Sequence, residues 1–244
     1  MKIGIFGDSF GDGGKMPITE KSRPWYNYLS DYHEVHNYSA SGVSLYYSYN
    51  RYLENKEVEF DRVIFLVTSV GRLSILTGKQ ELTFPNQVTH FDHAKGLLVH
   101  AVKKNHSHRI MLYQTAMNYF LHYQDQKQER LYHQLMLEKI RQIPNCLILP
   151  NFTDSFPMES GYVCLHNISE IDDHHYRNEL TQDYNFMFFD VRHCHFHDEN
   201  NNIFGQKILK WIDTGEWNLN MSEFTTPSDP LSYYMSNNFG AAKG

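Results

Sequence analysis

The sequence is poor in cysteine and has no long apolar segment. Its three cysteines, Cys146, Cys164 and Cys194, are widely spaced and form no CxxC pair. They therefore predict neither a disulfide framework nor a structural zinc site. No apolar stretch is long enough to cross a membrane, and the apolar run at the N-terminus is too short for a signal peptide. We expect a protein that folds in a reducing cytoplasm.

An excess of basic residues is also missing. The 244 residues include 22 Lys and Arg against 28 Asp and Glu, which gives a net charge of −6 with neutral histidines. This balance lacks the basic footprint of a nucleic-acid-binding protein, and we expect neither nucleic acid nor a membrane as a partner. Hydrophobic residues make up 41% of the chain. That share is enough for a core and argues against a disordered chain, and the length fits one α/β domain with insertions.

Short apolar runs alternate with segments of helical periodicity. Strands are expected at residues 3–6, 34–38, 62–67, 109–114 and 145–149, and helices at 26–32, 44–53, 93–104, 125–141 and 201–212. An alternation of strand and helix predicts a parallel sheet that is covered on both faces. The fold class expected is therefore α/β, a three-layer α/β/α sandwich with a mainly parallel, five-stranded sheet.

The pattern changes twice along the chain. Residues 151–187 interrupt the alternation and are interpreted as an insertion within a domain that spans residues 1–213. Residues 214–244 are polar but keep several aromatic side chains. They form either a loose tail or an arm that docks on a neighbouring subunit or a partner, and both hypotheses stay open.

Ser9 follows the first expected strand, in the segment Gly7-Asp8-Ser9-Phe10. A serine nucleophile needs an exposed hydroxyl, a base and donors for the oxyanion. The end of a parallel strand that opens into a turn and a helix is a suitable platform. The backbone N–H of Ser9 can itself point at the oxyanion. Taken alone, the segment is a weak signal, because a turn whose serine caps a helix gives the same pattern.

A second segment strengthens the interpretation of Ser9 as a nucleophile. After the next expected strand the chain reads Asn37-Tyr38-Ser39-Ala40-Ser41-Gly42. With Gly-Asp-Ser-Phe in the first block, this order resembles the SGNH/GDSL hydrolase family, whose fold is flavodoxin-like. The resemblance implies that Ser9 is the nucleophile and that Gly42 gives a backbone N–H to the oxyanion hole. A glycine suits that position because the backbone can approach the substrate closely.

This chain departs from the third sequence block of the family. The family has Gly-x-Asn-Asp after the third strand, with the asparagine as a further oxyanion donor, and Val70 is its nearest counterpart. Loss of one such donor typically costs about a hundred- to a thousandfold in rate. Thr68, Ser69 and Arg72 are the candidate substitutes. Arg72 has two interpretations, namely contact with a substrate or pairing with an acidic neighbour.

The last block of the family is Asp-x-x-His before the closing helix. Asp190 and His193 have that spacing, whereas His195 has the better distance to the helix. The segment that begins at His195 also resembles the His-(Leu/Met)-Ser-x-Glu-Asn pattern of small SGNH-like proteins of tailed phages. We prefer His195 as the general base, with His193 as the second candidate and Asp190 as the acid that orients the imidazole.

The same segment permits a metal site. His193, His195 and His197 alternate, so an extended chain would present them on one face, and residues 172–175 add further ligand types. Histidines are scattered widely through this chain, so we favour a protein without metal or cofactor.

Two functions follow from the resemblance. The first is a serine esterase that hydrolyses a short acyl ester of the O-acetyl kind, with a carbohydrate as one candidate alcohol. The second is a non-catalytic or weakly active structural or adhesin component of a phage particle. In that case the protein is made in the host cytoplasm, becomes associated with the virion, and uses residues 214–244 for self-association or for a virion partner.

Overall fold

The structure is a computed structural model of the whole chain. It describes residues 1–12, 24–40, 43–70, 72, 95, 98–99, 101–122, 125–168, 196 and 198–225. Their elements are β1 (Lys2–Phe6), α1 (Trp25–Ser30), β2 (Glu34–Asn37), α2 (Leu45–Glu54), η1 (Lys56–Val58), β3 (Arg62–Val67), α4 (Ser107–His122), α5 (Gln126–Ile140), β4 (Cys146–Pro150), α7 (Asp198–Thr214) and η2 (Met221–Glu223). The described residues within 1–12 and 36–162 form one compact unit, and those within 24–35 and 163–225 form another.

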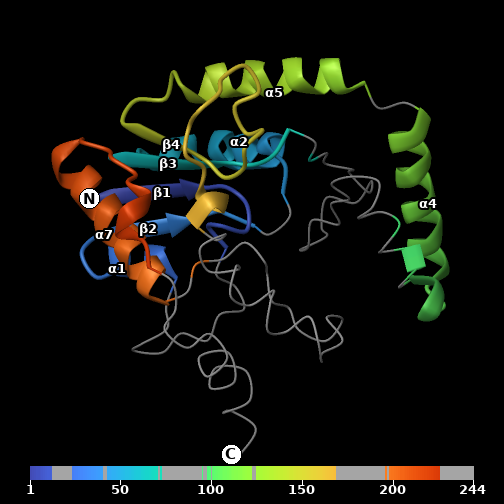
Figure 1. Cartoon of the computed structure of the whole chain (residues 1–244), viewed down its shortest axis with the longest axis horizontal. Helices are drawn as coiled ribbons and strands as arrows, with labels where there is room; N and C mark the ends of the chain where they lie inside the picture. Colours follow the sequence, from blue (N-terminus) through green and yellow to red (C-terminus); the bar gives the residue numbers. More distant parts are fainter. Residues whose placement is uncertain are drawn as a thin grey trace, which may run out of the picture. The chain divides into compact units, whose positions relative to one another are not determined.

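The strands form a four-stranded sheet in the order β2-β1-β3-β4 (Figure 1). β3 is parallel to both of its neighbours, β1 and β4. Beside β1, Tyr38 N–H donates to the Ile5 carbonyl and Ala40 N–H to the Gly7 carbonyl. The two partner numbers rise together, so β2 is also parallel to β1. The expected fold class is confirmed as an α/β fold with a parallel sheet flanked by helices.

One expected strand is wrong. Residues 109–114 lie inside α4 rather than in the sheet, so the described sheet has four strands, not five. Tyr113 and Ala116 are buried, with Ile110 and Met117 partly buried beside them. This spacing of three and four residues follows one face of a helix. The short apolar run was ambiguous because only its continuation through Ala116 and Met117 carries the helical period.

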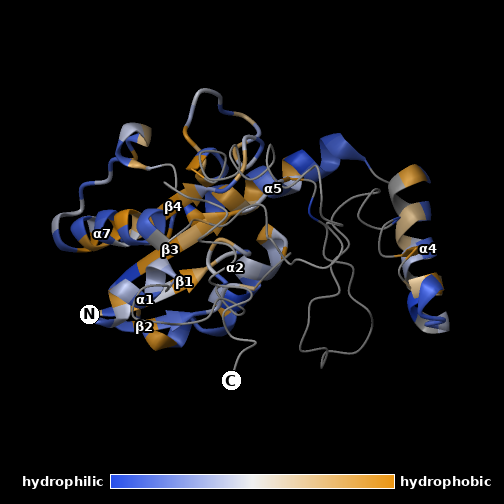
Figure 2. Cartoon of the chain, turned by 60° about the horizontal axis from the view of Figure 1, so that its bottom comes forward, coloured by the Kyte–Doolittle hydropathy of each residue, from blue (hydrophilic) through white to orange (hydrophobic). Residues whose placement is uncertain are grey.

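Alternation along the strands divides the core into two faces. Phe6, Val63, Phe65 and Val67 point to the face where α2 and α5 pack, together with three buried side chains of these helices: Leu45, Leu137 and Ile140. Phe6 stacks on Phe65 with the ring centroids 5.3 Å apart. β1, β3 and β4 are accordingly among the most apolar parts of the sheet unit, whereas β2 is mostly hydrophilic (Figure 2). Both helices begin with a side-chain cap, because Ser44 accepts from Tyr47 N–H and Asp125 from two N–H groups.

In the other unit, α1 packs on α7. Trp25 is buried, and its backbone N–H donates to Asn201 Oδ1 at 3.0 Å. The Trp25 ring meets Phe204 edge to face, with the centroids 5.2 Å apart. The helices approach closely at Gly205, where an added Cβ would lie 3.0 Å from the Trp25 carbonyl oxygen. The predicted closing helix is confirmed. Of the four apolar positions expected on its buried side, Phe204, Ile208 and Ile212 are buried, whereas Ile203 is only partly buried.

The chain beyond α7 returns along this helix up to residue 225. Asn200 binds Thr225 twice, since its Nδ2 donates to the Thr225 carbonyl and its Oδ1 accepts from the Thr225 N–H, both at 2.9 Å. Phe224 is buried, and Lys207 pairs with Glu223 at 2.6 Å. The first part of residues 214–244 therefore packs on its own chain. The remainder lies outside the described residues, and the predicted domain boundaries stay predictions.

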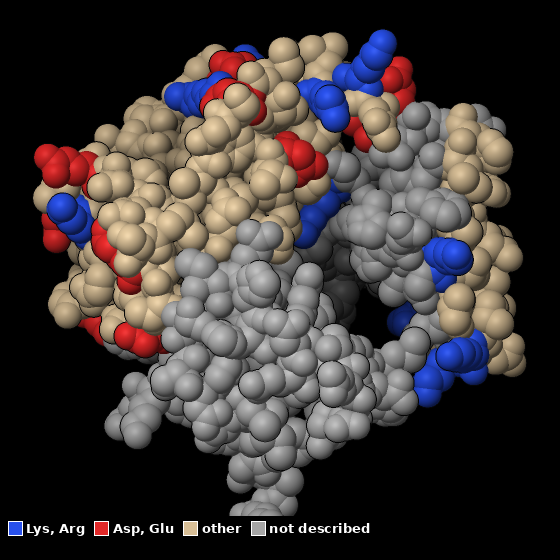
Figure 3. Space-filling view, in the orientation of Figure 1, with Lys and Arg blue, Asp and Glu red and all other residues tan. Residues whose placement is uncertain are grey.

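The described surface mixes both signs of charge. Acidic and basic side chains lie next to one another over α5, as Figure 3 shows for this face. Among the described residues, no helix combines the length and apolar character that a membrane crossing requires.

Candidate active site

Ser9 lies in a tight turn directly after β1. The Gly11 and Asp12 N–H groups both donate to the Asp8 carbonyl, at 3.0 and 3.1 Å, and close the turn. Ser9 is half-buried, whereas the residues on either side of it are buried. Gly7 allows β1 to end this close to β3, because a Cβ on Gly7 would lie 2.4 Å from the Leu66 Cβ. The turn thus presents Ser9 from a closely packed base.

The order of the strands gives this turn its position. From β1 the chain goes to β2 on one side, and it later returns to β3 on the other side. In open parallel sheets, ligands bind outside the carboxyl ends of the strands where the winding direction switches. Ser9 follows the carboxyl end of β1, the strand at which this switch occurs. The fold therefore puts Ser9 at the edge where a ligand is expected.

Asp8 ties the ends of three strands together. Its side chain is completely buried. Asp8 Oδ2 accepts from Arg72 Nη1 at 2.7 Å, and Asp8 Oδ1 accepts from Asn151 Nδ2 at 2.6 Å and from the Phe10 N–H at 3.1 Å. Arg72 comes from the segment after β3, and Asn151 follows β4 directly. Asp8, the residue before Ser9, is thus held by the segment that follows β3 and by the segment that follows β4.

Two opposing effects act on the Asp8 carboxyl. Burial raises its pKa above the ordinary value of 3.8, and this effect outweighs the Arg72 charge and the hydrogen bonds, which lower it.

The Arg72 guanidinium also lies over the Phe152 ring, 4.8 Å from its centroid. Phe152 in turn meets Phe10 edge to face at 5.8 Å. The turn that carries Ser9 is therefore fixed by both polar and aromatic contacts.

The candidate substitutes for the missing asparagine are largely engaged. Arg72 pairs with Asp8, which matches the second of its two interpretations. The Ser69 hydroxyl donates to Asp154 Oδ2 at 2.7 Å. Thr68 is buried directly after β3. Its hydroxyl makes no hydrogen bond of normal geometry with the described residues, yet it lies close enough to Asp8 to favour the ionised carboxylate.

Four predicted site residues cannot be placed around Ser9. Gly42, Asp190, His193 and His195 lie outside the described residues, and their roles stay predictions. The alternative metal ligands at 172–175 and at His197 lie outside them as well. Within the part of the chain that the structure describes, no group of three or more metal-ligating side chains occurs.

Sequence reasoning missed Asn151 and the role of Asp8. Asn151 is completely buried, and because its amide nitrogen faces Asp8, its Oδ1 points elsewhere. That oxygen has no hydrogen-bond partner among the described residues. A polar residue directly after a buried strand was the available signal, since strand ends share one edge of a parallel sheet. Asn37, quoted above only as a motif position, donates to the Gly11 carbonyl at 2.7 Å and so braces the same turn.

Comparisons with known proteins add little to this geometry. No family model matches the sequence, and no curated protein matches it significantly. Among solved structures, the chain is similar to the acetyl xylan esterase AlAXEase, with 16% identity and a TM-score of 0.33 over 86% of this chain and 98% of that one. So low a TM-score leaves the fold assignment to rest on the sheet and helices described above.

Proposed function

We propose that the protein is a serine esterase of the SGNH/GDSL type that hydrolyses a short acyl ester. The observation that supports this most is the position of Ser9, half-buried in a braced turn at the carboxyl end of β1 where the sheet changes its winding direction. Such a turn provides a rigid platform for a nucleophile and leaves room for a substrate outside the sheet.

The proposed reaction has two steps. Ser9 Oγ attacks the ester carbonyl carbon while His195, oriented by Asp190, takes the hydroxyl proton; His193 is the second candidate base. The backbone N–H groups of Ser9 and Gly42 stabilise the oxyanion. Collapse breaks the bond to the alcohol, which leaves with the proton from the histidine. A water molecule, deprotonated by the same base, then releases the acid from the acyl-enzyme.

The expected rate is modest. The Val70 side chain is apolar, Ser69 and Arg72 are already bonded to Asp154 and Asp8, and the Thr68 hydroxyl is buried beside Asp8. Without a side-chain donor from this segment, we expect a rate about a hundred- to a thousandfold below that of a complete site. The same observation favours the second candidate function, a non-catalytic SGNH-fold component of a phage particle.

Hydrolysis of 4-nitrophenyl acetate separates the two functions. We expect Ser9→Ala to lower kcat by at least about a thousandfold because the covalent route is lost. His195→Ala is expected to match that loss, and His193→Ala to retain most activity. Equal, near-background rates for the wild type and Ser9→Ala, with both proteins folded by circular dichroism, would reject the esterase in favour of the structural component.

A further inference from the structure

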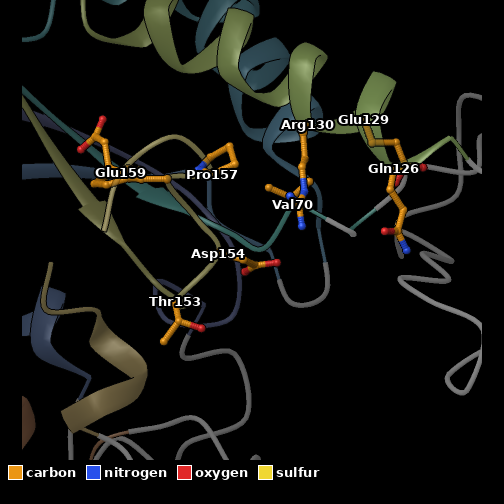
Figure 4. Close-up of a pocket in the computed structure, with 9 residues that line it drawn as sticks. Val70, Gln126, Glu129, Arg130, Thr153, Asp154, Pro157 and Glu159 are labelled. Carbon is orange, nitrogen blue, oxygen red and sulfur yellow. The ribbon is translucent and has the colours of Figure 1, made fainter. Parts of the chain in front are cut away.

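A cavity of about 320 Å³ lies where the segments after β3 and β4 face the start of α5. Its walls come from Val70 after β3, from the chain between Thr153 and Glu159 after β4, and from the first turns of α5. Figure 4 shows Glu129 and Arg130 extending from α5, with Val70 below them and Asp154 on the loop across the cavity. Its volume is at the lower end of the range typical of small-molecule sites, about 300–1,000 Å³.

The two segments that bound this cavity are the ones that hold the Ser9 turn. After β3, Val70 lines the cavity while Arg72 bonds to Asp8. After β4, Asp154 lines the cavity while Asn151 bonds to Asp8. The Ser69–Asp154 hydrogen bond joins the two segments. The cavity is therefore built into the same strand-end edge as the candidate nucleophile.

The charges of the lining select the ligand. The lining holds three carboxylates, of Glu129, Asp154 and Glu159, and one guanidinium, that of Arg130. Glu159 is compensated by its ion pair with Arg141, so Glu129 and Asp154 leave an excess of one negative charge over Arg130. An anionic ligand is disfavoured by this excess of negative charge. An apolar ligand would displace water from these charged groups and offer them no hydrogen bond, which is costly. A neutral ligand with several hydroxyl groups fits both signs, since hydroxyls donate to carboxylates and accept from a guanidinium.

Individual groups on the wall are open for such contacts. Arg130 makes no hydrogen bond or ion pair with the described residues, unlike Arg141, which is paired with Glu138 and Glu159. Asp154 uses Oδ2 for the Ser69 hydroxyl and keeps Oδ1 as a further acceptor. Phe156 and Pro157 add apolar surface of the kind that packs against the C–H face of a sugar ring.

We infer that this cavity binds a neutral, polyhydroxylated alcohol of the sugar class, as the subsite for the alcohol part of the ester. The inference rests on the proposed function for its catalytic meaning, since the alcohol is the leaving group of that reaction. Binding itself does not require hydrolysis, so the two proposals can fail separately.

Ligand-observed NMR titration with three unacetylated probes tests the binding: methyl β-D-glucoside, methyl β-D-xyloside and methyl N-acetyl-β-D-glucosaminide. At least one is expected to bind the wild type and Ser9→Ala with equal affinity. Arg130→Met and Asp154→Asn are each expected to weaken that binding about tenfold, because each removes a charged hydrogen-bonding group. The matched control is Arg109→Met, an exposed arginine on α4 that does not line the cavity.

Two outcomes would overturn the inference. One is that none of the three glycosides binds the folded wild type. The other is that both cavity variants bind as tightly as Arg109→Met does, which puts the binding site elsewhere. If glycoside binding behaves as expected while 4-nitrophenyl acetate is not hydrolysed, the cavity assignment stands and the esterase proposal fails. If only hydrolysis is found, the esterase stands without this subsite.

Discussion

At the scale of single residues, the turn around Ser9 depends on a neighbour that carries no proposed chemistry. Asp8 is completely buried and receives its hydrogen bonds from Arg72, Asn151 and the Phe10 N–H. A buried ion pair is weak evidence for stability by itself, but removal of one partner leaves the other charge uncompensated. Asp8 and Arg72 are therefore expected to matter as a pair.

Asp8→Ala is predicted to lower the free energy of unfolding by about 3 kcal/mol, because the Arg72 guanidinium then loses its carboxylate. Adding Arg72→Met is predicted to restore part of this loss. Urea unfolding of the two single variants and the double variant gives the coupling energy, expected to be at least about 1 kcal/mol. Additive effects would show that the pair is not a unit.

A pH effect is expected from His133. This side chain is buried, its Nε2–H donates to the Ser155 carbonyl at 2.8 Å, and burial lowers its pKa below the ordinary value of 6.5. As the pH falls below about 6.5, the unfolded chain takes up a proton that the native state resists. This site therefore stabilises the native state at neutral pH and loses that contribution as the medium becomes acidic, by at most about 1.4 kcal/mol per pH unit.

The comparison of wild type with His133→Gln isolates this contribution. Glutamine keeps an N–H donor but does not titrate, so the variant is predicted to lose less stability than the wild type between pH 7.5 and 5.5 in urea unfolding. His106→Gln, an exposed site, serves as the control and is predicted to follow the wild type. Parallel pH profiles for wild type and His133→Gln would contradict the assignment.

At the scale of elements, close approaches decide how helices and strands pack. α1 and α7 meet at Gly205, where a Cβ would lie 3.0 Å from the Trp25 carbonyl oxygen and 3.2 Å from the Tyr28 Cβ. The first of these atoms belongs to the backbone and cannot rotate away. Glycine in mid-helix is intrinsically unfavourable by about 1 kcal/mol relative to alanine, so packing must justify its presence here.

Gly205→Ala is predicted to destabilise the protein by about 1–3 kcal/mol, in spite of the better helix propensity of alanine. Thermal unfolding followed by circular dichroism measures the change. Asn202→Ala, at an exposed position of the same helix, reports the propensity effect alone and is predicted to be neutral or stabilising. A gain in Tm for Gly205→Ala would contradict the close packing of α1 on α7.

At the scale of the whole molecule, the chain after α7 is part of the folded structure up to residue 225. Asn200 binds Thr225 through both of its amide atoms, and Phe224 is buried. These contacts give residues 215–225 a structural role that does not depend on a partner. The hypothesis of an assembly arm therefore concerns residues 226–244.

Two shortened chains separate these roles. A chain ending at Thr214 is predicted to be less stable than one ending at Thr225 by about 2–4 kcal/mol, from the lost burial of Phe224 and the loss of the two Asn200–Thr225 hydrogen bonds. Chemical unfolding of both measures the difference. Equal stability would mean that residues 215–225 contribute nothing to the fold. A smaller particle size for the chain ending at Thr225 than for the full chain would support the arm.

Local patterns in the sequence determined most of the fold. The apolar runs of β1, β3 and β4 are short and bounded by polar residues, and α5 carries its own capping residue, Asp125. Such signals are local, because strand and helix periods show within a few residues. The expected strand at 109–114 is wrong because the short apolar run within it, residues 110–113, does not distinguish a strand from part of a helix. Ser9 could be proposed as the nucleophile from the sequence because its motif lies within four residues.

Only the tertiary structure decided how Asp8, Arg72 and Asn151 come together. Arg72 lies 64 positions after Asp8 in the sequence, and Asn151 lies 143 positions after it. No local pattern connects the three residues. They meet because the carboxyl ends of parallel strands share one edge of a sheet, whose order follows from packing rather than from sequence neighbourhood. The same edge forms the cavity between Val70, Arg130 and Asp154. The sequence alone determined where the nucleophile candidate lies, and the packed strand ends decided what surrounds it.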